Sequence, residues 1–162
     1  MTPLVHIDRD DNLEAPDDES FRRWVAAALL GAGQDVGPAP EISIRINDVD
    51  EMTQLNTTYR RKTGPTNVLS FPVAVPQGVE TDLLGDIAIC APVVAQEAAE
   101  QNKSKESHWA HMTVHGVLHL LGFDHIEEQQ AETMEKLEVA IMAQLTYPDP
   151  YQFADIERAS IP

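Results

Sequence analysis

The segment from His115 to His125 reads HGVLHLLGFDH, and the spacing of its histidines decides which fold and which chemistry to expect. His115 and His119 are four residues apart. On an α-helix, side chains at this spacing lie on one face, with Cβ atoms roughly 5–6 Å apart. Two imidazoles at that distance can bind one cation, although the same pair is also typical of a polar stripe on an amphipathic helix.

Gly122 and His125 favour a metal site over a polar stripe. Glycine suits the end of a helix because it adopts the left-handed conformation without a Cβ penalty. A chain reversal at Gly122 brings His125 beside the other two imidazoles, which gives three nitrogen ligands and one open position, as in catalytic zinc sites. The order His-x-x-x-His-x-x-Gly-x-x-His also matches the ligand spacing of the long zinc-peptidase motif. We therefore expect His115, His119 and His125 to bind one metal ion.

Zn²⁺ is the ion that three imidazoles favour. Ni²⁺, Co²⁺ and Cu²⁺ also bind nitrogen sites well, and availability in the cell often decides between them.

Gly116 departs from the peptidase pattern. In zinc peptidases the residue after the first histidine is a glutamate that acts as general base. Because Gly116 has no carboxylate, either another group accepts the proton or a metal-bound water, with a pKa of about 7 on zinc, is already ionised enough. Asp124 is the nearest carboxylate in the sequence, and we interpret it first as a residue that orients a ligand or shapes the turn and second as a base. Peptide hydrolysis by the usual route is not expected.

Two further histidines precede the motif on the same predicted helix. His108 and His111 project from the face that carries His115 and His119, but they lie one and two turns earlier, too far to bind the same ion. They are therefore either polar surface residues or contacts to the metal ligands and substrate. The opposite face of this helix is apolar and is expected to be buried; it carries Val114, Val117, Leu118 and Leu121.

The composition is that of one soluble globular domain. The chain has 162 residues, of which 43% are hydrophobic, and no run approaches the length of a transmembrane helix. Residues 1–8 lack the basic and apolar regions of a signal peptide, so we expect a cytoplasmic protein. Cys90 is the single cysteine and follows an apolar run, which predicts a buried, inert thiol.

The formal net charge of −16 is the main objection to a nucleic-acid substrate, because an acidic surface repels phosphate at long range. Net charge is an average, however, and Arg60, Arg61 and Lys62 place three of the eleven basic residues in one cluster. Arg60 by itself is also consistent with a surface arginine that complements the dipole at the end of a helix.

The hydrophobic pattern predicts an α+β fold, with a small mixed sheet packed against helices and one helix carrying the metal site. Prolines suggest that the third strand is an edge strand, and the apolar fourth strand is expected to be central. Residues from 149 onward read as a C-terminal tail of the single domain 1–162. The expected strands are 4–7, 41–47, 68–75 and 86–90. The first expected helix is capped by Asp18 or Ser20 and ended by Gly31 with Gly33, and the others are 48–62, 93–103, 105–121 and 131–145.

Four groups of residues, in matching order, resemble the YbeY family of bacterial endoribonucleases. They are Leu55-Asn56 with Tyr59-Arg60, the segment PTNVLSFP at 65–72, the segment LGDI at 84–87, and HGVLHLLGFDH at 115–125. The resemblance covers residues 40 to 147 and implies a zincin-like metal helix in an α+β fold. It also implies a metal-dependent endoribonuclease, specific for single-stranded RNA, that acts in ribosomal RNA maturation, including 16S rRNA 3′-end processing, and in ribosome quality control. Ribosomal RNA and proteins of the small ribosomal subunit are the implied partners.

Two hypotheses for the function belong to different classes. In the first, the metal ion polarises a phosphoryl oxygen or supplies hydroxide, and Arg60 holds the nonbridging oxygens in a bidentate fork. Arg61 and Lys62 then attract the RNA backbone, and either water or the 2′-hydroxyl is the nucleophile. In the second, the protein is a non-catalytic ribosome assembly factor with a structural metal, and its acidic surface contacts basic ribosomal proteins. Structural zinc usually has four protein ligands, whereas the spacing gives three.

Overall fold

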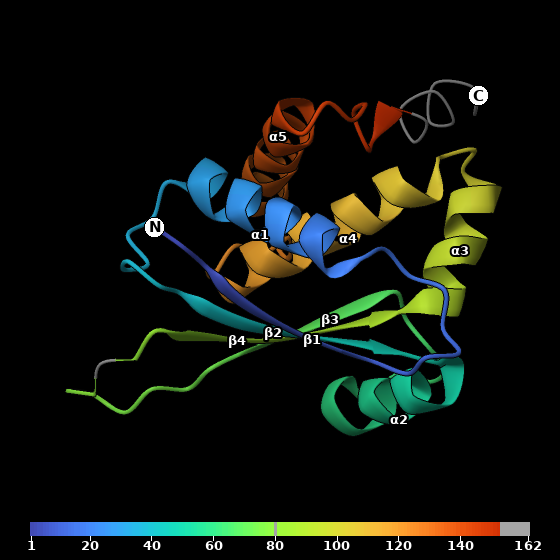
Figure 1. Cartoon of the computed structure of the whole chain (residues 1–162), viewed down its shortest axis with the longest axis horizontal. Helices are drawn as coiled ribbons and strands as arrows, with labels where there is room; N and C mark the ends of the chain where they lie inside the picture. The colour runs from blue at the N-terminus through green and yellow to red at the C-terminus, as the bar shows by residue number, and fades with distance from the viewer. Residues whose placement is uncertain (80, 153–162) are drawn as a thin grey trace.

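The computed structural model describes residues 1–79 and 81–152, and a four-stranded sheet forms its centre (Figure 1). The strands are β1 Leu4–Arg9, β2 Glu41–Asn47, β3 Val68–Pro72 and β4 Leu83–Cys90. The helices are α1 Asp18–Ala32, α2 Val49–Arg60, α3 Ala91–Glu100, α4 Lys105–Leu120 and α5 Glu128–Gln144. The predicted α+β class is confirmed. No helix among the described residues has the length and apolar character needed to cross a lipid bilayer.

The sheet is mixed, with the order β1-β2-β4-β3. β1, β2 and β4 pair in parallel, while β3 pairs antiparallel to β4. The predictions of an edge position for β3 and a central position for β4 are therefore confirmed. Three strand boundaries were wrong. β1 continues to Arg9 rather than ending at 7, and β3 ends at Pro72 rather than at 75. β4 begins at Leu83 rather than at 86, and its pairing with Glu41 precedes an irregularity in the register.

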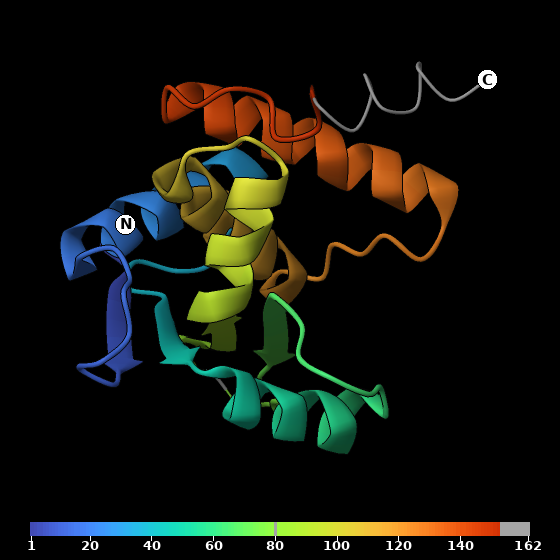
Figure 2. The same cartoon turned by 90° about the vertical axis from the view of Figure 1, so that its right-hand side faces the viewer.

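Helices cover the two faces of the sheet unequally. α2 lies against one face, while α1, α3, α4 and α5 lie on the other, with α5 outermost (Figure 2). Successive side chains of a strand therefore pack against different helices, on opposite faces of the sheet. The isoleucines of β2 are fully buried among α1 and α4, whereas Met52 of α2 packs with Leu69, Ala88 and Cys90 on the other face. The buried position of Cys90 agrees with its interpretation as an inert thiol.

Helix boundaries follow the capping residues of the sequence. Asp17, Asp48 and Ser104 each accept a hydrogen bond from a backbone N–H in the first turn of α1, α2 and α4. The expected cap of α1 at Asp18 or Ser20 is wrong, because both residues lie inside the helix. Gly33 ends α1 in the left-handed conformation, as expected. α5 begins at Glu128, three residues before the expected start at 131, without a side-chain cap.

α4 lies close to the sheet because Gly116 has no side chain. A Cβ added at Gly116 would lie 2.9 Å from Ile87 Cγ2 and 3.2 Å from Ile87 Cδ1, both on β4. In addition, Ser70 Oγ of β3 donates a hydrogen bond of 2.9 Å to the Gly116 carbonyl oxygen. The contact between glycine and isoleucine therefore sets the distance between the metal helix and the sheet.

We predict that Gly116→Ala lowers the free energy of unfolding by about 1–3 kcal/mol, because the new methyl group overpacks a closed interface. Urea denaturation measures this change. In an Ile87→Ala background the atoms that the methyl group would meet are absent, so the same substitution should cost much less or become stabilising. An equal cost in both backgrounds would show that the contact with Ile87 is not the cause.

Candidate metal centre

Three histidines converge at the C-terminal end of α4. The Nε2 atoms of His115 and His119 are 3.1 Å apart, and the ring of His125 lies 5.7 Å and 5.1 Å from theirs, measured between centroids. One ligand nitrogen from each residue lies within 4.8 Å of the others. The sequence motif thus brings together the three side chains that it predicts as a site.

The turn that delivers His125 depends on Gly122. Gly122 has a φ of +97°, in the region that glycine adopts without strain. The N–H of Gly122 donates to the His119 carbonyl, and the N–H of Phe123 donates to the Leu118 carbonyl, which closes the helix end. Asp124 Oδ1 then accepts a 2.7 Å hydrogen bond from the His125 N–H, consistent with its interpretation as a turn residue.

The donor set fits a divalent ion of the zinc type. Burial lowers the pKa of His119 to about 4, and the positive charges of His115 and His125 act in the same direction. His119 is therefore neutral at physiological pH, as a metal ligand must be. Three imidazoles whose ligand nitrogens lie within 4.8 Å of one another are a typical ligand set for one catalytic Zn²⁺.

A second polar cluster adjoins His115 on the side that faces away from the other two candidate ligands. It is centred on Glu138 of α5, which is 1% exposed. Glu138 Oε2 accepts hydrogen bonds from His111 Nε2, from the Tyr151 hydroxyl at 2.9 Å and, more weakly, from His115 Nδ1 at 3.4 Å. Burial acts to raise the pKa of Glu138, but the hydrogen bonds from His111 and His115 outweigh it, and the pKa falls to about 2. Glu138 is thus a buried carboxylate anion next to the candidate ligands.

The reading of His108 and His111 as polar surface residues is wrong, because they are only 2% and 6% exposed. His108 Nε2 hydrogen-bonds Glu97 Oε1 of α3 at 2.9 Å, and Asn67 donates to the same carboxylate. The helix is buried on both of its faces, so the polar stripe meets carboxylates of α3 and α5 rather than water. Periodicity on one helix could not show which elements cover it.

The stretch expected to be a tail begins inside the folded structure. Residues 153–162 lie outside the described part, but Pro150 is buried and Tyr151 packs edge-on against the ring of His111, with centroids 5.3 Å apart. Burial raises the pKa of Tyr151 above its usual value, so its hydroxyl stays protonated and acts as a donor to Glu138. Glu138 and Tyr151 are site residues that sequence reasoning missed, because only long-range packing brings them here.

The candidate ligands open onto a hollow of about 800 Å³. Arg60 and Lys62 line this hollow together with the three histidines, whereas Arg61 is the left-handed residue that follows α2 and does not line it. Within residues 1–79 and 81–152, Arg60 and Lys62 form no ion pair. Both cations are therefore available to a ligand in the hollow.

Exposed apolar side chains also border this hollow. Tyr59 is 64% exposed and contacts Phe71 edge-on at 5.2 Å, and Ile126 is 83% exposed. Exposed rings beside cations suit the unpaired bases and phosphates of a single-stranded nucleic acid.

Gly116 leaves no place for the glutamate of a zinc peptidase. The Cβ of any larger residue would already meet Ile87, and the position faces the sheet rather than the hollow. Residue 116 therefore cannot supply the carboxylate that zinc peptidases use as general base at this position.

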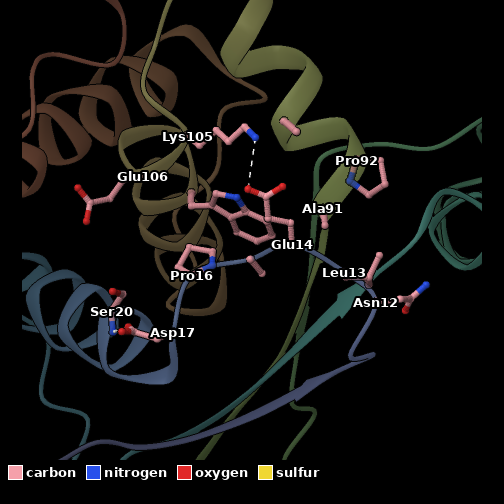
Figure 3. A pocket seen from close by; sticks show the side chains of 13 residues that line it. Asn12, Leu13, Glu14, Pro16, Asp17, Ser20, Ala91, Pro92, Lys105 and Glu106 are labelled. Carbon is pink, nitrogen blue, oxygen red and sulfur yellow. Dashed lines mark hydrogen bonds and ion pairs between the residues drawn. The ribbon is translucent and has the colours of Figure 1, made fainter.

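A second hollow, of about 500 Å³, lies beside the N-terminal half of α4 (Figure 3). Trp109, Leu13 and Pro16 line it, and Lys105 Nζ pairs with Glu14 at 3.5 Å across its edge. None of the candidate metal ligands borders it. Of these two hollows, the one at the histidines thus combines metal ligands with unpaired cations.

Comparisons with known proteins agree on one family. The model of the family "Endoribonuclease YbeY" matches residues 6–146. The endoribonuclease YbeY of Methylococcus capsulatus is 56% identical over 146 residues, which cover 90% of this chain and 93% of the relative. The YbeY proteins of Nitrosococcus oceani and Pseudomonas entomophila are 55% and 51% identical and cover 94% and 97% of this chain, and 99% and 97% of their own lengths. The solution structure of TM1509 from Thermotoga maritima has a TM-score of 0.57 at 22% identity, covers 98% of each chain, and supports the fold alone.

We predict that the purified protein binds one divalent ion and that His125→Ala lowers the metal content and the melting temperature. A ligand present at 100 times its Kd stabilises the native state by about 2.7 kcal/mol, so a chelator should produce a similar loss in the unaltered protein. Elemental analysis and thermal unfolding measure both effects. His6→Ala, which changes an exposed histidine on β1, is the matched control and should retain the ion. Full metal content in His125→Ala would remove it from the ligand set.

Proposed function

The chain belongs to the YbeY family of endoribonucleases, and from this membership we propose that it is a metal-dependent hydrolase that cleaves single-stranded RNA. The observation that supports this proposal is one hollow in which three imidazoles, Arg60 and Lys62 face the same space. A cation with an open coordination position and free guanidinium and ammonium groups matches the charge of a phosphodiester.

In this proposal each side chain has a separate role. His115, His119 and His125 hold one divalent ion, with Zn²⁺ as the first candidate. When bound, such an ion polarises a phosphoryl oxygen and lowers the pKa of water. Arg60 binds the nonbridging oxygens through two parallel N–H donors and stabilises the charge that develops on them. Tyr59 offers an exposed ring on which an unpaired base can stack.

The distribution of charge answers the objection raised by the net charge of −16. Several arginines and lysines elsewhere are neutralised in ion pairs, among them Arg9 with Asp18 and Lys105 with Glu14. Arg45 is surrounded by three carboxylates. The unpaired cations at 60–62 therefore give this part of the surface a local positive charge, although the net charge of the protein is negative. RNA can bind at this positive site.

The substrate we propose is ribosomal RNA, with the 3′ end of 16S rRNA as the processing site, in the cytoplasm and in contact with proteins of the small subunit. The acidic remainder of the surface suits basic ribosomal proteins. The alternative, a non-catalytic assembly factor with a structural metal, requires a closed set of ligands. Among the residues described here, the three histidines border an open hollow instead.

We predict that Arg60→Lys retains metal and fold but cleaves single-stranded RNA about 10²–10³ times more slowly, because a point charge replaces a bidentate fork. The measurement is turnover at saturating RNA with the metal-replete protein. His115→Ala serves as the inactive reference, and equal activity in that variant would reveal contamination. Turnover of Arg60→Lys at the unaltered rate would exclude Arg60 from stabilising the phosphoryl charge.

Lys62 and Arg61 provide a matched pair of cations, one lining the hollow and one not. We predict that Lys62→Ala weakens RNA binding and reduces the slope of log K against log salt by about 0.7, the value for one contact to single-stranded phosphate. Arg61→Ala should change the slope less. Filter binding across a salt series, with the His115→Ala protein to prevent cleavage, measures both slopes. A larger effect for Arg61→Ala would place the RNA backbone outside the hollow.

A further inference from the structure

We propose that Glu138 is a positioning residue of the metal centre, which orients the His115 ring so that its Nε2 faces the ion. The inference rests on the proposed metal-dependent function and adds a residue 13 positions beyond the histidine motif, on a different helix. His111 and Tyr151 in turn hold the Glu138 carboxylate in place.

The two nitrogens of His115 face opposite partners. Nε2 lies 3.1 Å from His119 Nε2, at the point where the three candidate ligands meet, while Nδ1 lies 3.4 Å from Glu138 Oε2. A histidine that binds a metal through one nitrogen carries a proton on the other. The proton on Nδ1 is therefore aimed at Glu138. A carboxylate in this position fixes the tautomer, limits rotation of the ring and makes the imidazole a stronger ligand.

The carboxylate is itself held by two further donors from different parts of the chain. His111 Nε2 of α4 and the Tyr151 hydroxyl, beyond the end of α5, both donate to the oxygen that faces His115. Within the described residues, His111 Nδ1 is buried without a hydrogen-bond partner, which agrees with a proton on Nε2. The orientation of Glu138 is thus determined before any ion binds.

A structural role as the partner of buried His111 accounts for only part of this arrangement, because the same carboxylate oxygen also faces His115. Glu138 shares the buried face of α5 with Met134, Ile141 and Met142. Burying a charged carboxylate there is unfavourable, and an apolar residue of similar volume would connect α5 to α4 at lower cost. The group instead lies against a nitrogen whose other face points at the site. This is the geometry in which a buried anion strengthens a metal ligand.

The same atoms could in principle form a second metal site, because nitrogens of His111 and His115 and an oxygen of Glu138 lie within 4.8 Å of one another. Direct hydrogen bonding between His111 Nε2 and Glu138 Oε2 leaves no room for an ion between them. Binding through both His115 nitrogens would also require its fully deprotonated form. A positioning carboxylate is the arrangement that needs neither change.

The test measures metal affinity without RNA. Zn²⁺ competition against a chromophoric chelator should give a Kd about 10–100-fold weaker for Glu138→Gln than for the unaltered protein. Tyr151→Phe, which removes one of the donors that hold Glu138, should give a smaller weakening. Glu132→Gln makes the same charge change at an exposed position of α5 and should leave the Kd unchanged.

A structural role is separated from a positioning role by two readouts. The absorption bands of bound Co²⁺ report ligand geometry, and they should shift in Glu138→Gln but not in Glu132→Gln. The melting temperature of the metal-free proteins reports packing alone. Unchanged Kd and Co²⁺ spectra in both Glu138→Gln and Tyr151→Phe would overturn the proposal even if the metal-free proteins melt earlier.

The stoichiometry of the unaltered protein distinguishes the remaining outcomes. One ion per chain, lost with His125→Ala and weakened with Glu138→Gln, supports the positioning role. Two ions per chain would assign Glu138 to a second metal site and overturn it. An unaltered protein that binds no ion would contradict the metal centre itself, whereas normal binding that is insensitive to Glu138 would contradict only the positioning role.

Discussion

Burial of α4 is the constraint on which the rest of this structure depends. Twelve of its sixteen residues are buried, because the sheet covers one side and α1, α3 and α5 cover the others. A helix so enclosed must satisfy every polar side chain inside the protein. The three histidines that precede the last turn of α4 therefore need partners from other elements, and those partners connect the layers of the molecule.

Carboxylates supply these partners one after another along the helix. Glu97 of α3 faces His108, and Glu138 of α5 faces both His111 and His115. α3 and α5 thus each contribute one carboxylate to the polar stripe of α4, half-buried in the case of Glu97 and buried in the case of Glu138. Only at the C-terminal end of the helix does the stripe leave the interior, and there the histidines face a hollow instead of a carboxylate. At this end of the helix the Nε2 atoms of His115 and His119 have no carboxylate partner among the described residues, so they are available to bind a metal ion.

The approach of α4 to the sheet and the chemistry of the hollow are linked through Gly116. Its contact with Ile87 lets α4 lie against β3 and β4, so that β3 and the end of α2 form the opposite wall of the hollow. The same glycine places no carboxylate where a zinc peptidase carries its general base. The wall formed by β3 and the end of α2 brings Arg60 and Tyr59 beside the candidate ligands.

The sequence alone determined what depends on short-range geometry. The spacing of His115, His119, Gly122 and His125 fixes a helical pair and a turn within eleven residues, so three candidate ligands could be named before their positions were known. Alternation and capping residues likewise gave the α+β class, the edge position of β3 and the central position of β4.

Only the tertiary structure decided which segments cover the helix. Glu138 is the hydrogen-bond partner of both His111 and His115, and it also accepts from the Tyr151 hydroxyl. The helical period of the motif does not indicate either position. The tertiary structure also distinguishes two neighbouring cations. Lys62 lines the hollow, whereas Arg61 has a left-handed backbone conformation and does not line it. The physical reason is the same in each case. The local sequence determines which side chains share one face of a helix, but the long-range packing of other elements determines which residues contact that face.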